Sequence, residues 1–341
     1  MDKFRHPISL RTPLPSQLGT LCLAILAFCL SNCGTRPKIR IAVIPQTDGI
    51  PLWDIPHAAI EEAADRIGAI IYWNAPTRED DVEAQISLVE HVIDKNSYQG
   101  LILAPDQALA LISPVRRALS RGIPTVILGS PLAMPASGNL YYILNNDEEG
   151  GRIAATRIAA ILHGRGTVAV LGINPDIAGI MQRAHSFETY LQQNYPNIHI
   201  VEKRTGSYNI PREQQVAEDT LRVHPDLDAI VAFMWSSTNG ALSATRILPD
   251  HHPIKIVGFD ATILPQFDES SGLDSVVQED SRAMGEQAIE LIHLRQLKQP
   301  VHSLTLLHPT LITRDNINSA EVRKIFLTDW QYGHLHWNRM Q

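Results

Sequence analysis

The chain has 341 residues and a formal net charge of −7, which argues against a nucleic-acid partner because nucleic acids select basic surfaces. Hydrophobic residues make up 44% of the chain, so it can bury enough apolar surface for one large or two medium domains. The three cysteines, Cys22, Cys29 and Cys33, all fall in one stretch near the start. The remainder therefore has no disulfide framework and must be stable through its core alone.

The first 32 residues have the layout of a secretory signal. Lys3, Arg5 and Arg11 precede an apolar block at about 18–30, and small or polar residues follow it. A membrane-spanning helix needs about 20 apolar residues, so this block is too short to span a bilayer comfortably. We expect residues 1–32 to be removed, and an uncleaved signal anchor is the alternative.

The end of this segment, Leu30-Ser31-Asn32-Cys33, resembles the lipobox of bacterial lipoproteins: an aliphatic residue, two short residues and a cysteine. The resemblance implies that Cys33 is acylated and becomes the mature N-terminus, although Asn32 stands where Gly or Ala is usual. Each buried methylene of an acyl chain contributes about 0.8 kcal/mol, so several chains hold a domain on a bilayer. The alternative is ordinary cleavage nearby, with Cys33 removed or left as a free thiol.

From residue 39 onward, short apolar runs typical of buried parallel strands alternate with amphipathic helical patterns. In the first half, strands are expected at 39–45, 69–75, 100–105 and 124–130, and helices at 53–68, 79–96 and 109–122. In the second half, helices are expected at 148–164, 182–196, 212–225, 239–248 and 282–294, and strands at 167–173, 198–206, 228–234, 254–260 and 273–278. The break at 139–150 predicts an α/β protein with two parallel-sheet lobes, and an eight-stranded barrel is the competing solution.

Polar and aromatic side chains follow many of these strands, and ligands of open parallel sheets bind beyond the carboxyl ends of the strands. Carboxylates and amides pair with sugar hydroxyls, and flat aromatic rings cover the apolar face of a pyranose. The sequence therefore predicts a sugar site between two lobes that close over the ligand. The candidate ligand-binding residues are Asp48, Trp53, Ser130, Arg183, Tyr208, Trp235, Asp260 and Gln278.

Several of these candidates also have a purely structural alternative. Trp53 fits plain core packing, Asp260 fits the N-cap of a following helix, and Asp48 fits a turn. Arg183 fits a surface ion pair, and Tyr208 fits a buried ring whose hydroxyl the protein itself satisfies. The prediction depends on their shared position at strand ends rather than on any one residue.

The order of motifs resembles the periplasmic sugar-binding proteins related to ribose-binding protein, over about residues 38–314. The motifs that carry the resemblance are "IRIAVIPQTDGIPLWD", "GLILAPDQA", "GIPTVILG", "NDEEGGRIAA", "RAHSF", "IKIVGFDA" and "SVVQEDSRAMGEQA". The resemblance implies the type I periplasmic binding fold, in which two Rossmann-like parallel-sheet lobes are joined by a three-strand hinge. By position, it implies that the sugar contacts are made by Leu52, Trp53, Arg183, Tyr208, Asp260 and Gln278.

The sequence departs from this family at two sugar-binding positions. Gly129-Ser130 stands where members that bind simple pyranoses often carry Asp-Arg, and Met234-Trp235 stands where an Asn-Asp pair is common. Two polar contacts are thus missing and an extra indole is present. We expect a ligand with a larger apolar face, or a less hydroxylated rim, than ribose.

The resemblance also sets the expected domain limits. These are 1–32 for the signal, 39–144 plus 278–305 for lobe one, 146–276 plus 306–314 for lobe two, and 315–341 for a C-terminal tail. The tail is unusual for the family and carries His334 and His336. Two histidines without a third ligand are weak evidence for a metal, so no metal site is predicted.

These observations predict a lipid-anchored, extracytoplasmic solute-binding protein that passes a small ligand, expected to be a carbohydrate, to the membrane permease of an ABC-type importer. The sequence has no GxSxG, no HExxH, no phosphate-cradling Gly-rich loop and no cysteine nucleophile beyond the leader, so neither catalysis nor a cofactor is expected. We expect a monomer. The alternatives are a receptor subunit that docks on a membrane kinase or chemoreceptor, and an enzyme built on this scaffold.

Overall fold

The computed structural model describes residues 38–326, except 49, 79, 249–252, 263–264, 266 and 268–271. The expected signal segment, Cys33 and the two histidines of the tail lie outside the described residues. Within the described part of the chain, no helix combines the length and the apolar character needed to cross a membrane.

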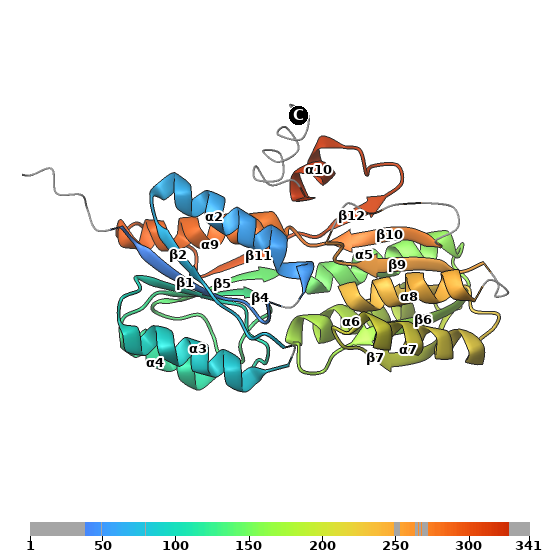
Figure 1. Ribbon diagram of the computed structural model, residues 1–341. Coiled ribbons are helices and arrows are strands. Elements are labelled where there is room, and N and C mark those ends of the chain that lie inside the picture. Colours follow the sequence, from blue (N-terminus) through green and yellow to red (C-terminus); the bar gives the residue numbers. More distant parts are fainter. Residues whose placement is uncertain are drawn as a thin grey trace, which may run out of the picture. The chain divides into compact units, whose positions relative to one another are not determined.

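The described chain forms two six-stranded sheets, each the centre of one lobe (Figure 1). Sheet A, in the order β11-β5-β4-β3-β1-β2, consists of β1 (Arg40–Ile44), β2 (Ile70–Trp73), β3 (Gly100–Leu103), β4 (Thr125–Gly129), β5 (Leu140–Asn145) and β11 (Leu304–Leu307). Sheet B, in the order β12-β10-β9-β8-β6-β7, consists of β6 (Gly166–Ile173), β7 (Ile198–Thr205), β8 (Ala229–Ala232), β9 (Lys255–Phe259), β10 (Leu273–Gln278) and β12 (Thr310–Thr313). Neighbours pair in parallel except β12, which runs antiparallel to β10. The predicted two-lobed α/β fold is confirmed, and the barrel alternative is wrong.

The chain passes between the two sheets three times: after β5, after β10, and between β11 and β12. The first passage begins where β5 ends at Asn145, and the second where β10 ends at Gln278. The third joins Leu307 to Thr310. Three adjacent connections of this kind act as a hinge, because small backbone rotations in them open or close the space between the lobes.

Helices cover both faces of sheet A, because successive side chains of its strands point to opposite sides. Ile41 and Val43 of β1 pack in an apolar cluster with one helix pair, and Ala42 and Ile44 pack in a second cluster with the other pair. The first pair is α2 (Asp54–Ile67) and α9 (Ser281–Gln296), and the second is α3 (Val82–Lys95) and α4 (Ile112–Ser120). The inner strands β1, β3 and β4 are therefore buried on both faces, as their continuous apolar runs predicted, whereas the edge strands β2 and β11 are partly exposed.

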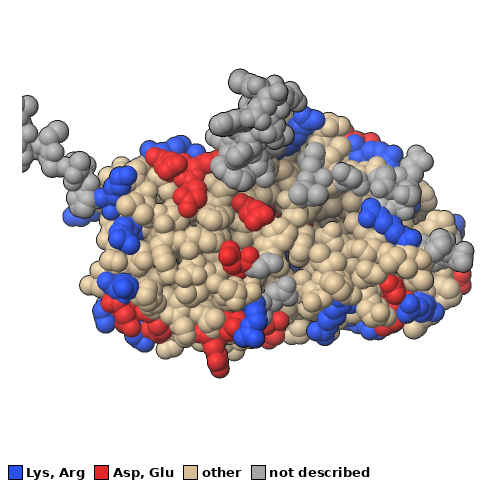
Figure 2. Space-filling view, viewed as in Figure 1, with Lys and Arg blue, Asp and Glu red and all other residues tan. Residues whose placement is uncertain are grey.

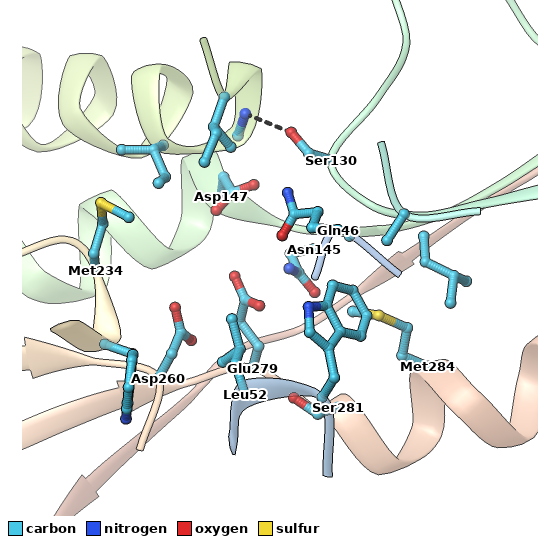
Figure 3. Close-up of a pocket in the computed structure, with 18 of the residues that line it drawn as sticks. Gln46, Leu52, Ser130, Asn145, Asp147, Met234, Asp260, Glu279, Ser281 and Met284 are labelled. Atoms are coloured by element: carbon cyan, nitrogen blue, oxygen red, sulfur yellow. Dashed lines mark hydrogen bonds between the residues drawn. The ribbon is translucent and has the colours of Figure 1, made fainter. Parts of the chain in front are cut away.

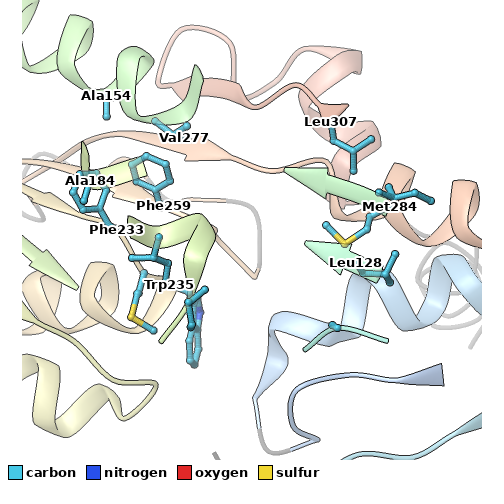
Figure 4. Packing of buried hydrophobic residues seen from close by; sticks show 14 of the residues in the cluster. Leu128, Ala154, Ala184, Phe233, Trp235, Phe259, Val277, Met284 and Leu307 are labelled. Atoms are coloured by element: carbon cyan, nitrogen blue, oxygen red, sulfur yellow. The ribbon is translucent and has the colours of Figure 1, made fainter. Parts of the chain in front are cut away.

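Sheet B is covered in the same way, with α5 and α6 on one face and α7 and α8 on the other. These helices are α5 (Asp147–Ile161), α6 (Ala178–Asn194), α7 (Ile210–Val223) and α8 (Trp235–Ile247). Phe233, Phe259 and Val277 pack in one apolar cluster with Ala154 of α5 and Ala184 of α6 (Figure 4).

Gly151 lets α5 and α6 approach closely. A Cβ atom at this position would lie 2.2 Å from the backbone oxygen of Arg183, which no side chain tolerates. The absence of a side chain at Gly151 therefore allows the segment of α6 that carries Arg183 to lie directly against α5.

Three elements differ from the sequence prediction. The segment 139–150, expected only as a break, contains β5, which lies inside sheet A between β4 and β11. Helices α6 and α8 begin at Ala178 and Trp235 rather than at 182 and 239. Ser236, Ser237 and Thr238 are weak helix formers, which hid the start of α8, but their hydroxyls bond to Ser207, Glu213 and Met234.

The strands β11 and β12 were not among the predicted strands, and two further short elements were not expected. The 3₁₀ helix η1 (Pro51–Trp53) precedes α2, and α10 (Ala320–Phe326) ends the described chain. The first part of the predicted tail is therefore an ordered helix that packs on elements of both lobes. Its cluster joins Val322, Ile325 and Phe326 to Ile55 of α2 and to Val276 and Ile312 of sheet B.

Charged side chains of both signs are dispersed over the face shown in Figure 2. Among the described residues visible there, the lysines and arginines form no continuous basic surface. This face therefore lacks the electrostatic footprint of a nucleic-acid-binding protein.

Candidate ligand-binding site

A cavity of about 90 Å³ lies between the two lobes, with room for several water molecules and hence for a small solute (Figure 3). One side, which we call the sheet-A wall, consists of residues from η1, α2, α9 and the ends of β1, β3, β4 and β5: Gln46, Leu52, Trp53, Pro56, Ala104, Leu128, Gly129, Ser130, Asn145, Ser281 and Met284. The other side, the sheet-B wall, consists of Asp147, Ile177, Gly179, Ile180, Arg183, Tyr208, Phe233, Met234, Trp235 and Asp260. Glu279 lines the cavity from the passage that follows β10.

Six of the eight predicted residues line this cavity: Trp53, Ser130, Arg183, Tyr208, Trp235 and Asp260. The structure does not bring Asp48 and Gln278 to it. Asp48 is exposed, and its backbone N–H donates to the carbonyl of Pro76, a residue of another loop, so it lies outside the cavity lining. Gln278 is buried, accepts a hydrogen bond from the Ala261 amide and donates to the Glu279 carbonyl, so its amide holds the hinge backbone.

Arg183 lies at the centre of a buried ionic cluster, with 4% of its surface exposed. Nε and Nη2 donate to Oδ1 of Asp147 (2.9 and 2.7 Å), and Nη2 also donates to Oε1 of Glu279. Nη1 donates to Oδ2 of Asp260 (3.0 Å) and to the carbonyl of Phe233 (2.8 Å). A guanidinium has five N–H donors, and these five contacts use all of them. The alternative of a surface ion pair is wrong, and Arg183 itself has no donor left for a ligand.

Backbone geometry places two of the three carboxylates, Asp147 and Asp260, beside this guanidinium. Asp147 is the first residue of α5, where the helix dipole favours a negative charge, and the Asn146 side chain caps that helix by accepting from the Glu149 amide. Asp260 follows β9 with a φ of 55°, a left-handed conformation that aspartate adopts more readily than most residues. Both carboxylates thus follow from turns at the ends of secondary structure.

Charge in this cluster is unbalanced, because three carboxylates surround one guanidinium. Burial raises the pKa of Asp147 and of Asp260, and the nearby Arg183 only partly offsets it. Burial, together with the negative charge of Asp260, raises the pKa of Glu279 well above its usual value. Burial lowers the pKa of Arg183, but the surrounding carboxylates raise it beyond its usual range, so the guanidinium is charged.

Buried polar atoms without a hydrogen-bond partner among the described residues gather at this cavity. They include Oδ1 of Asp260, Oδ1 of Asn145 and Nε1 of Trp53. Leaving such an atom unpaired costs about 1–3 kcal/mol, so each is a contact point for a bound molecule or ordered water. These atoms come from both walls. Two of them are acceptors and one is a donor.

The lobes contact each other directly across the cavity. The backbone N–H of Gly179 donates to Oγ of Ser130 at 2.9 Å, which Figure 3 marks with a dashed line. The Tyr208 hydroxyl donates to Oε1 of Gln46 at 3.3 Å. Ser130 and Tyr208 therefore bind the opposite lobe in this conformation, which is closed.

Asp147, Asn145, Gln46 and Glu279 were missed as candidate site residues. Asn145 and Asp147 fall in the segment 139–150, which was interpreted only as the break between the lobes, and Glu279 lies one residue beyond the predicted Gln278. Gln46 directly follows the first strand, so the strand-end rule alone could have found it. The other three residues lie where the chain leaves one sheet to cross to the other lobe. Such a crossing passes through the space between the lobes, so residues next to a predicted crossing are also candidates for the site.

A family model described as a periplasmic binding protein domain matches residues 41–295. The chain belongs to this family. Membership implies a place outside the cytoplasm, and the curated relatives are binding proteins rather than enzymes. The D-ribose/D-allose-binding protein of Pseudomonas aeruginosa is 26% identical over 261 residues, covering 74% of this chain and 80% of the relative. The D-allose-binding periplasmic protein of Escherichia coli is 26% identical over 226 residues, covering 64% and 72%.

Solved structures of ABC-transporter solute-binding proteins share the fold of this periplasmic binding protein. One from Agrobacterium vitis with bound D-fucose has a TM-score of 0.79 at 22% identity, covering 84% of this chain and 100% of that one. Another from Actinobacillus succinogenes with bound D-allose has a TM-score of 0.75 at 21% identity, covering 82% and 99%. At this identity the likeness establishes the fold, and the ligand has to be argued from the residues of the cavity.

Proposed function

We propose that this protein is an extracytoplasmic solute-binding protein that captures a small sugar and delivers it to an ABC-type importer. The observation that carries the proposal is the cavity, which both lobes line and which holds buried polar atoms without protein partners. Two relatives are binding proteins for D-ribose or D-allose, and a solved structure with the same fold holds D-fucose, which favours the same class of molecule.

Binding in this proposal works by hinge closure. A ligand that contacts both walls gains its full set of hydrogen bonds only when the lobes are together, so it shifts the population toward the closed form. Closure removes water from the carboxylates of Asp147 and Asp260, which strengthens each hydrogen bond they accept. Trp53 on one wall and Trp235 on the other supply flat apolar surfaces for the C–H faces of a sugar ring.

The proposal includes the parts of the chain that precede the cavity. Cys33 would carry the lipid that tethers the mature protein to the membrane, close to its permease. The lobes, bounded as the sequence predicts, would move as two rigid bodies on the three connections. A monomer is sufficient for this role, because one chain supplies both walls of the site.

The experiment that tests the proposal compares two aspartates that both follow strands. Asp260→Asn removes a carboxylate inside the cavity, and Asp48→Asn removes one outside it. Sugar binding, measured by thermal shift and calorimetry over a panel of pentoses and hexoses, should weaken at least about tenfold in the first variant and stay unchanged in the second. Native mass spectrometry of protein purified from its own host would name the sugar.

Two results would contradict the proposal. One is a folded protein that shows neither a thermal shift nor compaction in solution scattering with any sugar of the panel. The other is sugar binding that Asp48→Asn and Asp260→Asn weaken equally, because the ligand would then lie outside this cavity.

A further inference from the structure

The polar atoms that the cluster leaves for a ligand are mostly acceptors. Asp147, Asp260 and Glu279 each bind Arg183 through a single oxygen, at Oδ1, Oδ2 and Oε1 respectively. Of their second oxygens, Oδ1 of Asp260 is fully buried and has no hydrogen-bond partner among the described residues. All five N–H donors of Arg183 bind protein acceptors, so Arg183 cannot donate to a sugar oxygen.

The three carboxylates also converge in space. Figure 3 shows the carboxylates of Asp147, Asp260 and Glu279 around the same part of the cavity, with Asn145 beside them. Oδ1 of Asn145 is a fourth acceptor without a partner there. A molecule that fits this corner has to donate several hydrogen bonds from one place and accept few.

An ammonium group has these properties, and a sugar hydroxyl does not. A primary ammonium carries three N–H donors and no acceptor, whereas each hydroxyl also brings lone pairs that need donors of their own. The charge agrees, since one guanidinium faces three buried carboxylates, and a second cation brings the cluster closer to neutrality. Trp235 and Trp53 add ring faces, which attract cations as well as apolar C–H groups.

We propose that the ligand of this cavity carries a protonated amino group, bound among Asp147, Asp260 and Glu279, on a sugar-sized frame: an amino sugar. This rests on the function proposed above and narrows the class of substrate. The frame lies toward the sheet-A wall, where Nε1 of Trp53 is a buried donor without a protein partner and suits a ring or hydroxyl oxygen. Burial and the charge of Asp260 raise the pKa of Glu279, and a cation bound beside it would favour the charged carboxylate, which fits this assignment.

The test is calorimetry on the full mature protein with matched pairs of sugars. D-Galactosamine, D-glucosamine and D-mannosamine are each compared with their neutral parent hexose and with the N-acetyl derivative, in which the amine carries no charge. At least one amine should bind about tenfold or more tightly than its parent, because charge-assisted hydrogen bonds are the stronger kind. The N-acetyl form should bind no better than the parent.

Variants locate the effect. Glu279→Gln and Asp147→Asn keep the shape of the side chain and remove its charge, and each should lower the ratio of amine to parent affinity by about tenfold. Glu290→Gln is the matched control, because Glu290 lies on α9 but is exposed. Two isosteric variants on separate elements are used so that a folding defect in one leaves the other to decide.

The outcomes separate this inference from the proposed function. A neutral hexose that binds as tightly as its amine overturns the amino-sugar assignment and leaves sugar binding intact. Retention of the full amine preference in both Glu279→Gln and Asp147→Asn also overturns it. Absence of binding to every sugar, neutral or charged, by a folded protein refutes the proposed function, and the inference falls with it.

Discussion

The two walls of the cavity differ in charge more than in size. The sheet-A wall presents amides, hydroxyls and apolar groups, such as Asn145, Ser130 and Leu128, and contributes no charged side chain among its described residues. The sheet-B wall presents Arg183 with Asp147 and Asp260, and Glu279 joins them from the hinge passage. Under the proposed function, this difference predicts a division of roles: the sheet-B wall would bind the polar end of the ligand, and the sheet-A wall would cover it.

The largest expected effect comes from breaking the charged wall. Arg183→Met removes the one cation among three buried carboxylates and should lower the free energy of unfolding at pH 7 by about 3–5 kcal/mol. Arg212→Met is the control, because Arg212 is exposed on α7, and it should cost less than about 0.5 kcal/mol. Urea unfolding measures both. A loss below 1 kcal/mol in Arg183→Met would show that the carboxylates are not organised by this residue.

The contacts between the walls are the next test. Ser130→Ala with Tyr208→Phe removes both direct bonds across the cavity, and at about 1 kcal/mol each this should weaken ligand affinity by about thirtyfold. Solution scattering should show a more open average form of the ligand-free double variant. The pair Ser113→Ala and Tyr190→Phe, outside the cavity, is the control. Unchanged affinity and dimensions would mean that these bonds do not hold the lobes together.

The fold followed from the sequence more fully than the site did. Runs such as Ile41 to Ile44 are apolar without interruption, and only a strand buried on both faces requires this pattern. Six of the eight candidate residues line the cavity for the same reason, since parallel strands deliver their ends to one edge. Asp147 and Glu279 escaped it because they lie on the hinge passages, whose path depends on how two separately folded lobes meet.

The sequence also does not predict which partners each side chain of the site contacts. Arg183 has the residue type of a sugar contact, yet all of its donors face protein acceptors, which depends on distances to three residues far apart in the chain. No local pattern encodes such a geometry. In the same way, Gln278 stands at a strand end, but its amide points to the backbone of the hinge rather than to the cavity.

A smaller effect is expected at the sheet-A wall, where Trp53 lies. Trp53→Phe keeps a six-membered ring and removes the pyrrole part of the buried indole together with its N–H, a donor that has no protein partner, so the free energy of unfolding should fall by about 1–2 kcal/mol. Ligand affinity should still fall by about five- to tenfold if the indole N–H donates to the ligand. Calorimetry decides between this and pure stacking, in which Trp53→Phe leaves affinity unchanged.

The smallest expected effect concerns Asp106, a buried acidic residue that follows β3 of sheet A. Burial raises the pKa of Asp106 to about 6 from 3.8, and the charges of Asp80, Asp176 and Asp81 add to the shift. A folded-state pKa above the unfolded value means that the folded protein holds more protons between pH 4 and 6, so this group makes stability fall as the pH rises through that window.

Asp106→Asn should therefore raise the free energy of unfolding at pH 7 by about 1 kcal/mol and leave it almost unchanged at pH 4. Asp176→Asn removes a charge from the sheet-B side that raises the Asp106 pKa, so it should shift the stability in the same direction by a smaller amount. Thermal unfolding between pH 4 and pH 7.5 measures both variants. If Asp176→Asn leaves the pH profile unchanged, the charge of Asp176 on the sheet-B side does not act on Asp106 on the sheet-A side.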